Sequence, residues 1–246
     1  MWFSLRYFLL LTTIVPLCSG EDVNYSVVYS VSGVDRIRKV EGHTRPYIKR
    51  ISKGDTILAG DTLTTGDSAF CEIKSESNTI RLGSDTILRN LGPKHWQLID
   101  GSILLCLMDD TTFQLDSKKG SSLLSGPSTI ITENTTNGGY KIISLSGKTT
   151  INIVGEKTQI PSGRLALVLG EKKKLGDGYD IDLLLLLRSS LLINAFEEPP
   201  PTMGKIGLAV YAQQKKLKGK FDILIGDAPT DKNLQMWVMG KEADKK

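Results

Sequence analysis

The sequence has very few of the residues that catalytic and metal sites use most often. It contains two histidines, His43 and His95, in separate turn-rich stretches of a 246-residue chain. It has no HExxH or CxxC pattern and no Cys/His cluster, which argues against a zinc site. It also lacks a GxSxG nucleophile turn and a phosphate-binding P-loop. We therefore predict no catalytic, cofactor-binding or metal-binding residues, and we expect the protein not to be an enzyme.

Aromatic residues and net charge are also low. Aromatic residues make up 7% of the chain, and Trp96, Tyr140 and Trp237 are too scattered in sequence to indicate a sugar-binding platform. The adjacent carboxylates Asp109 and Asp110 precede a strand-like segment, where such a pair is typical of a turn. The net charge is only +4, and the lysine clusters lack the interleaved aromatic residues of a nucleic-acid groove. We expect no nucleic-acid partner.

Long hydrophobic runs are absent after the first twenty residues. Residues 1–20 combine one positive charge, an apolar stretch (YFLLLTTIVPL) and a small-residue end (CSG), which is typical of a signal peptide cleaved before Glu21. We therefore expect a periplasmic or secreted protein with no permanent transmembrane span after processing. Two alternatives stay open: a retained N-terminal anchor, and a lipoprotein attached at Cys18, although VPLC lacks the small residue that usually precedes a lipidated cysteine.

Cysteine is scarce as well, because only Cys71 and Cys106 remain after residue 20. Both occur in apolar, strand-like segments, SAFCEIK and ILLCLM. In an oxidising compartment they could form a disulfide that closes a loop of about 35 residues. They could equally be buried free thiols that behave as small hydrophobic side chains. The sequence leaves both interpretations open.

No helix-length amphipathic run occurs before residue 178, and short strands take its place. From Asn24 to about Gly170, strand-like segments alternate with Gly, Pro, Ser and Asp turns. FCEIK puts Cys71 and Ile73 on one face, and TIRLG does the same with Ile80 and Leu82. These patterns predict a mainly β domain over residues 21–177.

The pattern changes after residue 178. IDLLLLLRSSLLINAF, residues 181–196, predicts a buried helix with Asp180 or Asp182 at its start, ended by EEPPP. A second helix is expected at about Met203 to Lys218, followed by two strands around an Asp-Ala-Pro turn. Residues 178–246 are therefore predicted to form a C-terminal helical and strand extension, a small α+β appendage.

One repeated feature needs an explanation: Gly-Asp occurs at 54–55, 60–61 and 66–67. Calcium-binding repeats have a period of nine and many more acidic residues, whereas this ladder has a period of six and three steps. We predict that each pair makes a tight corner, with the glycine at positive φ and the aspartate bonded to its own backbone. Asp55, Asp61 and Asp67 are thus predicted to form turns and not to bind metal.

The stretch KGDTILAGDTLTTGDSAFCEIKSESNTIRLGSDTILRNL resembles the core of the FecR domain family. The similar elements include Gly60-Asp61, Thr65-Gly66 and Asp85-Thr86, and their order and spacing extend over about residues 26–170. The resemblance implies an all-β domain on the envelope side, arranged as a twisted sandwich or a solenoid. Family members in iron-uptake signalling relay transporter occupancy by protein contact and carry a cytoplasmic anti-sigma segment. Here the domain directly follows the signal peptide, so we expect that segment to be lacking.

These observations lead to three hypotheses. The first is a non-enzymatic, FecR-type envelope or secreted module for protein interaction, in cell-surface signalling or envelope assembly. Its partner would be an envelope protein, bound by strand addition at a sheet edge. The alternative is a binder of cell-wall polymer or polysaccharide. The third, an enzyme, would require a nucleophilic or acidic residue with a perturbed pKa in a cleft.

Overall fold

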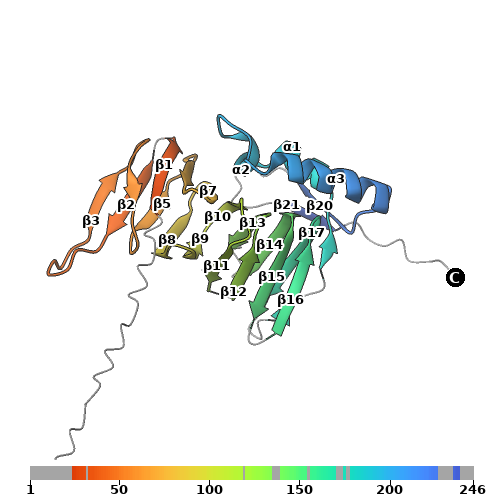
Figure 1. The fold of residues 1–246 in the computed structure, drawn as a ribbon, viewed down its shortest axis with the longest axis horizontal. Coiled ribbons are helices and arrows are strands. Elements are labelled where there is room, and N and C mark those ends of the chain that lie inside the picture. The colour runs from red at the N-terminus through yellow and green to blue at the C-terminus, as the bar shows by residue number, and fades with distance from the viewer. Residues whose placement is uncertain are drawn as a thin grey trace, which may run out of the picture.

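The computed structural model describes residues 24–31, 33–118, 120–134, 139–153, 156–169, 174–175, 178–226 and 235–238 (Figure 1). The predicted signal peptide at residues 1–20, with the alternative lipidation site Cys18, lies outside the described residues. So does the C-terminal end from residue 239 onward.

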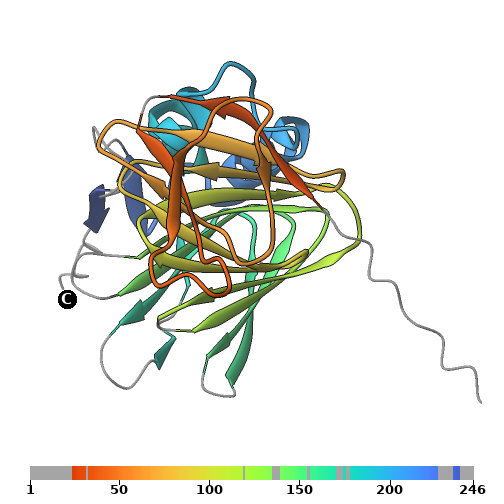
Figure 2. The ribbon, with the colours of Figure 1, turned by 90° about the vertical axis from the view of Figure 1, so that its left-hand side faces the viewer.

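The described strands form two large sheets packed face to face, and Figure 2 shows them as stacked layers with the N-terminal strands in front. Sheet A contains β1 (Tyr25–Ser30), β4 (Thr56–Ile57), β6 (Cys71–Lys74), β7 (Asn78–Leu82), β10 (Ser102–Leu107), β13 (Ser128–Asn134), β14 (Tyr140–Ser146), β17 (Arg164–Leu169), β18 (Lys174–Leu175) and β19 (Tyr179–Asp180). Sheet B contains β2 (Val34–Arg38), β3 (Tyr47–Arg50), β5 (Thr62–Thr65), β8 (Ile87–Gly92), β9 (His95–Asp100), β11 (Thr112–Ser117), β12 (Ser121–Ser125), β15 (Lys148–Ile153) and β16 (Glu156–Pro161). A separate ribbon pairs β20 (Ile223–Gly226) with β21 (Gln235–Val238).

Strand order in both sheets follows the sequence closely. Sheet B runs β3-β2-β5-β8-β9-β11-β12-β15-β16, and sheet A runs β4-β1-β6-β7-β10-β13-β14-β17-β18. As far as β17 the chain therefore crosses between the sheets every one or two strands and advances along the sandwich, as in a solenoid. Between β9 and β11 the chain passes through sheet A once, as β10, and β9 and β11 are therefore parallel neighbours in sheet B. The predicted mainly β fold, with a small helical part at the C-terminal side, is confirmed.

Alternation of side chains builds the core between the sheets. In β6 and β7, Cys71, Ile73, Ile80 and Leu82 all point into the sandwich and are fully buried, as their spacing predicts. The opposite face of these strands differs from a simple half-buried strand. Every residue of β7 is buried, including Arg81, because the C-terminal segment covers the outer face of sheet A.

Three helices form that cover: α1 (Leu183–Ser189), α2 (Leu191–Asn194) and α3 (Met203–Leu217), which lie along the outside of sheet A (Figure 1). They share a second hydrophobic cluster with the sheet, in which Leu104 and Ile143 meet Leu186 and Leu192. The extension predicted from residue 178 is thus packed on the β domain. No helix in the described ranges is long and apolar enough to cross a membrane.

The predicted helix over residues 181–196 is divided at Ser190. Asp182 is its N-cap, as one of the two alternatives predicted, and its carboxylate accepts the N–H groups of Leu184 and Leu185 at 3.0 and 3.2 Å. Ser190 is extended, with ψ of 124°, and a new turn of helix follows it. The neighbouring Ser189 hydroxyl donates to the Leu185 carbonyl at 2.9 Å, a local bond that competes with regular helix geometry.

Two of the three Gly-Asp corners form as predicted. At Gly54–Asp55 and Gly60–Asp61 the glycines have φ of +93° and +88°, and each aspartate N–H donates to the carbonyl three residues earlier at 3.1 Å. Each carboxylate also accepts the N–H of that earlier residue, Ser52 at 3.0 Å and Leu58 at 2.9 Å. The turns therefore satisfy their own backbone groups.

The third corner is different, and the prediction of a positive φ at its glycine is wrong. The turn runs from Gly66 to Ala69, whose N–H donates to the Gly66 carbonyl at 3.2 Å. The positive φ of +56° falls on Ser68, and Asp67 is exposed. The Gly66 N–H instead donates to the carbonyl of Gly33 at 3.0 Å. Gly66 is therefore the first residue of the turn and not, like Gly54 and Gly60, a residue within it.

Candidate protein-interaction edge

Strand β3 is the last described strand at one edge of sheet B. It pairs only with β2, in an antiparallel register that runs from Asp35 opposite Arg50 to Arg38 opposite Tyr47. Pro46 precedes the strand and cannot donate a backbone hydrogen bond. An edge strand turns part of its N–H and C=O groups outward, where another extended chain can pair with them.

The side chains of β3 are exposed along its whole length. Tyr47 is 55% exposed and Ile48 is 61% exposed, which are high values for large hydrophobic residues in a strand. Ile48 stands opposite Ile37 of β2, and Val40 in the connecting loop is 42% exposed. The edge therefore combines free main-chain groups with apolar side chains.

The two charged residues of β3 form ion pairs with carboxylates of the same chain. Lys49 contacts the Asp55 carboxylate at 2.7 Å, and Arg50 contacts that of Asp35 at 2.6 Å. Lysine on an edge usually discourages pairing with another strand. Here the ion pairs direct both charges toward neighbouring carboxylates of the same chain, so they oppose an incoming strand less.

Two arginines of β2, the strand paired with β3, bind groups on neighbouring segments of the same end of the sandwich. Arg36 donates to the Thr56 carbonyl at 2.9 Å, and Arg38 makes a bidentate pair with Asp61, with both distances 2.6 Å. Asp61 is fully buried, and its hydrogen bonds to Arg38 raise the pKa of that guanidinium above its usual value. Bidentate pairs fix geometry as well as charge, so they brace β2 and the edge strand paired with it.

The other edges in the described part of the molecule are less suited to pairing. Sheet A ends in the two-residue strands β4 and β18. At the far end of sheet B, β16 exposes the polar side chains of Lys157, Thr158 and Gln159 and no large hydrophobic residue among its described side chains, and it also contacts β17 of the other sheet. Among the edge strands whose side chains are described, β3 is the one that exposes large hydrophobic residues.

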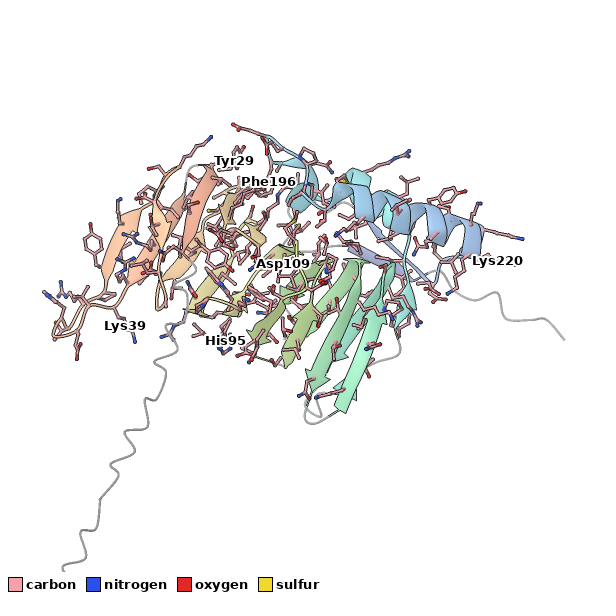
Figure 3. All side chains as sticks on the ribbon, viewed as in Figure 1. Tyr29, Lys39, His95, Asp109, Phe196 and Lys220 are labelled. Carbon is pink, nitrogen blue, oxygen red and sulfur yellow. The ribbon has the colours of Figure 1, made fainter. Side chains whose placement is uncertain are left out.

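A pocket of about 240 Å³ lies on the outer face of sheet A, beside Tyr29 and Phe196, which are labelled in Figure 3. The two rings lie 5.4 Å apart between their centres. Both Glu72 and Lys74 line the pocket, and they contact each other at 3.1 Å. Its lining mixes both charges and contains no histidine, serine or cysteine.

The two histidines lie in separate places on the surface and are not close to each other in sequence. His43 is in the exposed loop before β3, and His95 Nε2 lies 2.6 Å from the Asp116 carboxylate on the outer face of sheet B. Burial tends to raise the pKa of Asp116, but hydrogen bonds from Gln114 and His95 outweigh it and lower that pKa. No group of three His, Cys, Asp or Glu that could hold a metal occurs among the residues the structure describes.

The aromatic residues considered for sugar binding do not form a platform. Trp96 and Tyr140 are both fully buried in the core between the sheets, where the Trp96 ring meets that of Tyr25 edge-on at 5.0 Å. The side chain of Trp237 lies outside the described residues. Neither of the two described rings is therefore accessible to a polysaccharide.

The structure does not bring Cys71 and Cys106 together. Both are free thiols and fully buried. Cys71 is paired with Leu82 of β7 and faces the sandwich core, whereas Cys106 is paired with Thr79 and faces the helices. Because successive residues point to opposite faces, the two sulfurs lie on opposite sides of sheet A. This geometry favours two free thiols over a bridge between them.

We expect neither thiol to react with iodoacetamide in the folded protein at pH 8. Burial, followed by the nearby Glu72 charge, raises the pKa of Cys71 to about 12, and burial also raises the pKa of Cys106. Peptide mass spectrometry should find both residues alkylated only after denaturation in urea. Recovery of a peptide pair linked through Cys71 and Cys106 would contradict this arrangement.

No family model matches the chain, and no curated protein matches its sequence. Two crystal structures of a "putative anti-sigma factor" from Parabacteroides distasonis are similar in fold over part of the chain, each with a TM-score of 0.41. They are 8% and 7% identical to it, and each match covers 47% of this chain. The matches cover 57% of the neighbour's own length. A similarity of this size says nothing about what either protein binds.

The sequence did not point to the buried charges on the outer face of sheet A. Arg81 and Glu72 contact each other at 2.5 Å, with side chains only 1% and 5% exposed. TIRLG and FCEIK place these residues opposite the core, where charged side chains are ordinarily solvated. The five leucines at 183–187 were the signal that something covers this face, because such a segment requires an apolar surface to pack on.

Proposed function

We propose that this protein is a non-enzymatic protein-interaction module of the cell envelope or of the secreted fraction, and that β3 is its docking strand. The observation that carries the proposal is the outer edge of β3, which has no partner strand among the described residues, with Tyr47 and Ile48 more than half exposed. An extended segment of an envelope protein would add to sheet B beside β3. Main-chain hydrogen bonds would supply affinity, and contacts with Tyr47 and Ile48 would supply specificity.

A role in signalling or envelope assembly follows from the same mode of binding. The resemblance of residues 26–170 to the FecR domain agrees with it, because members of that family pass on transporter occupancy through protein contact. The bidentate Arg38–Asp61 pair supports a rigid edge, since a strand held in its binding conformation loses less entropy when a partner adds to it.

The test is photo-crosslinking in cells, with benzoylphenylalanine introduced at Ile48 or, as a matched control, at Thr158 on the opposite edge of sheet B. We expect a discrete adduct with one envelope protein from position 48 and none from position 158. In a second pair of variants, Tyr47→Lys with Ile48→Lys should reduce capture at least about tenfold, because lysines on an edge oppose strand pairing. Thr158→Lys with Gln159→Lys should leave it unchanged.

Two results would count against β3 as the docking strand. One is equal crosslinking from both edges, which would indicate non-specific contact. The other is recovery of the protein alone from cells that express it at its natural level. All four substituted side chains are exposed, so the lysine variants should fold normally. Circular dichroism checks this and so separates both results from a loss of folding.

A further inference from the structure

The outward face of helix α3 carries apolar side chains that the fold does not use. Leu208 is 70% exposed and Tyr211 is 60% exposed. The orientation of the helix is fixed from its other face, where the buried Gln213 amide donates to the carbonyls of Gly163 and Ile181 at 3.0 and 2.7 Å. Leu208 and Tyr211 are therefore held in solvent by the packing of the helix.

The same segment is strongly basic. Residues 199–221 contain five lysines, no arginine and no acidic residue. All five are exposed, and none is in an ion pair with a carboxylate of the described residues. These lysines are Lys205, Lys215, Lys216, Lys218 and Lys220. Figure 3 labels Lys220 at the end of this segment, far from Lys39 in the loop before β3.

The acidic residues close to α3 do not neutralise this charge. Asp180 lines a surface hollow together with Lys216, but its carboxylate lies 3.5 Å from the Arg164 guanidinium. The carboxylate of Asp222 accepts the backbone N–H of Asp180 at 2.9 Å. Asp180 is thus paired with an arginine, and the one further carboxylate, that of Asp222, does not balance five lysines, so this face keeps a net positive charge.

Helix geometry arranges these residues as one surface. Residues 204, 208, 211 and 215 follow each other at steps of three or four and share a stripe, with Lys205 and Lys216 beside it. On this stripe, the Lys215 ammonium lies 4.8 Å from the centre of the Tyr211 ring. An apolar centre with lysines at its margin is typical of helices that lie in the interface of a membrane.

We propose that this face of α3 binds the surface of an anionic lipid bilayer. Leu208 and Tyr211 would enter the headgroup region, and the flexible lysine side chains would reach the lipid phosphates while their stems cover apolar surface. The charge favours an anionic surface over a zwitterionic one. A nucleic acid is the less suited partner, because the face has no arginine and a single exposed aromatic ring, whereas single strands bind to stacked aromatic residues.

Binding by α3 leaves β3 accessible. The two elements lie at opposite ends of the long axis of the molecule (Figure 1). A protein held on lipid through α3 would therefore still present its edge strand to a partner. The lipid proposal does not depend on the partner proposal, since it rests on different residues.

The experiment is flotation of the purified full chain with vesicles of phosphatidylcholine alone or with 30–40% phosphatidylglycerol, roughly the charge range in which polybasic surfaces bind. Any contribution of the N-terminal hydrophobic segment is common to all variants. We expect clearly stronger binding to the anionic vesicles than to phosphatidylcholine alone. Lys205→Gln with Lys215→Gln should weaken it about 25-fold, because each surface lysine contributes about fivefold. The control, Lys39→Gln with Lys94→Gln, makes the same change in net charge and should alter binding less than twofold.

A second pair of variants tests the apolar part. Leu208→Ser with Tyr211→Ser should reduce binding to the anionic vesicles at least about tenfold at 0.15 M salt. Three results would each overturn the proposal. The Lys39/Lys94 control could lose as much binding as the Lys205/Lys215 variant, or the Leu208/Tyr211 variant could bind as well as the unchanged protein. The third is that the protein binds polyanionic RNA in preference to the vesicles. Since all of these side chains are exposed, the variants retain the fold, which circular dichroism verifies.

Discussion

Replacing Arg81 by methionine should lower the free energy of unfolding by about 3 kcal/mol, because a buried carboxylate then loses its partner. Arg81 Nε contacts the Glu72 carboxylate at 2.5 Å, and both side chains are almost fully buried. Lys74, which is a third exposed, lies 3.1 Å from the same carboxylate and would compensate in part. The expected loss is therefore at the lower end of what breaking a buried ion pair costs. Urea unfolding followed by fluorescence measures it.

Arg81 also holds the C-terminal segment on the sheet. Its guanidinium donates to the carbonyls of Leu192 and Ile193 at 3.3 and 3.2 Å, and to that of Glu198. The first two belong to the end of α2, where carbonyls lack helical partners. The Phe196 ring lies 4.3 Å from the Arg81 guanidinium carbon. One side chain thus connects β7 to a segment more than a hundred residues later.

The matched control for this prediction is Arg50→Met. Arg50 also contacts a carboxylate, that of Asp35, at 2.6 Å, but its side chain is 63% exposed. An exposed ion pair contributes at most about 1 kcal/mol, so the control should change stability far less. Adding Glu72→Gln to the Arg81→Met variant should restore part of the lost stability, since it removes the uncompensated charge. Equal losses for Arg81→Met and Arg50→Met would contradict the role of burial.

What the sequence predicted well depends on local rules. Strand alternation in FCEIK and TIRLG placed Cys71 and Ile80 on the inner face, because period-2 spacing fixes which face a residue takes. The Asp182 cap and the Gly54–Asp55 turn depend on bonds within three residues of the chain. Helix α3 was predicted within one residue at its C-terminal end.

What the sequence did not predict depends on contacts between distant segments. The partners of Arg81 in the α2 segment are more than 110 residues away in sequence. The separation of Cys71 from Cys106 follows from the order β6-β7-β10 and from the face each cysteine occupies. The exposed edge at β3 also depends on strand order, because YIKR alone does not reveal which strand ends a sheet. Local sequence patterns predict the strands, but the candidate docking edge can be found only once the pairing of the strands is known.

Replacing Trp96 by alanine should lower the free energy of unfolding by about 3–5 kcal/mol, the usual cost of removing a large aromatic side chain from a core. Trp96 is fully buried between the sheets and meets the Tyr25 ring at 5.0 Å. Thermal unfolding followed by circular dichroism checks the expectation. The control is Tyr47→Ala, which removes a ring that is 55% exposed and should change stability by less than about 0.5 kcal/mol.

These two variants also distinguish the functional alternatives. A polysaccharide binder that stacks sugars on Trp96 would lose affinity for insoluble cell-wall material in Trp96→Ala protein measured well below its unfolding temperature. We expect no such direct loss, because the buried ring cannot touch a polymer. In contrast, Tyr47→Ala should weaken capture of a protein partner while leaving the protein as stable as before. Weaker binding of Trp96→Ala protein to cell-wall material, together with unchanged capture of a protein partner by Tyr47→Ala protein, would favour the polymer as the ligand.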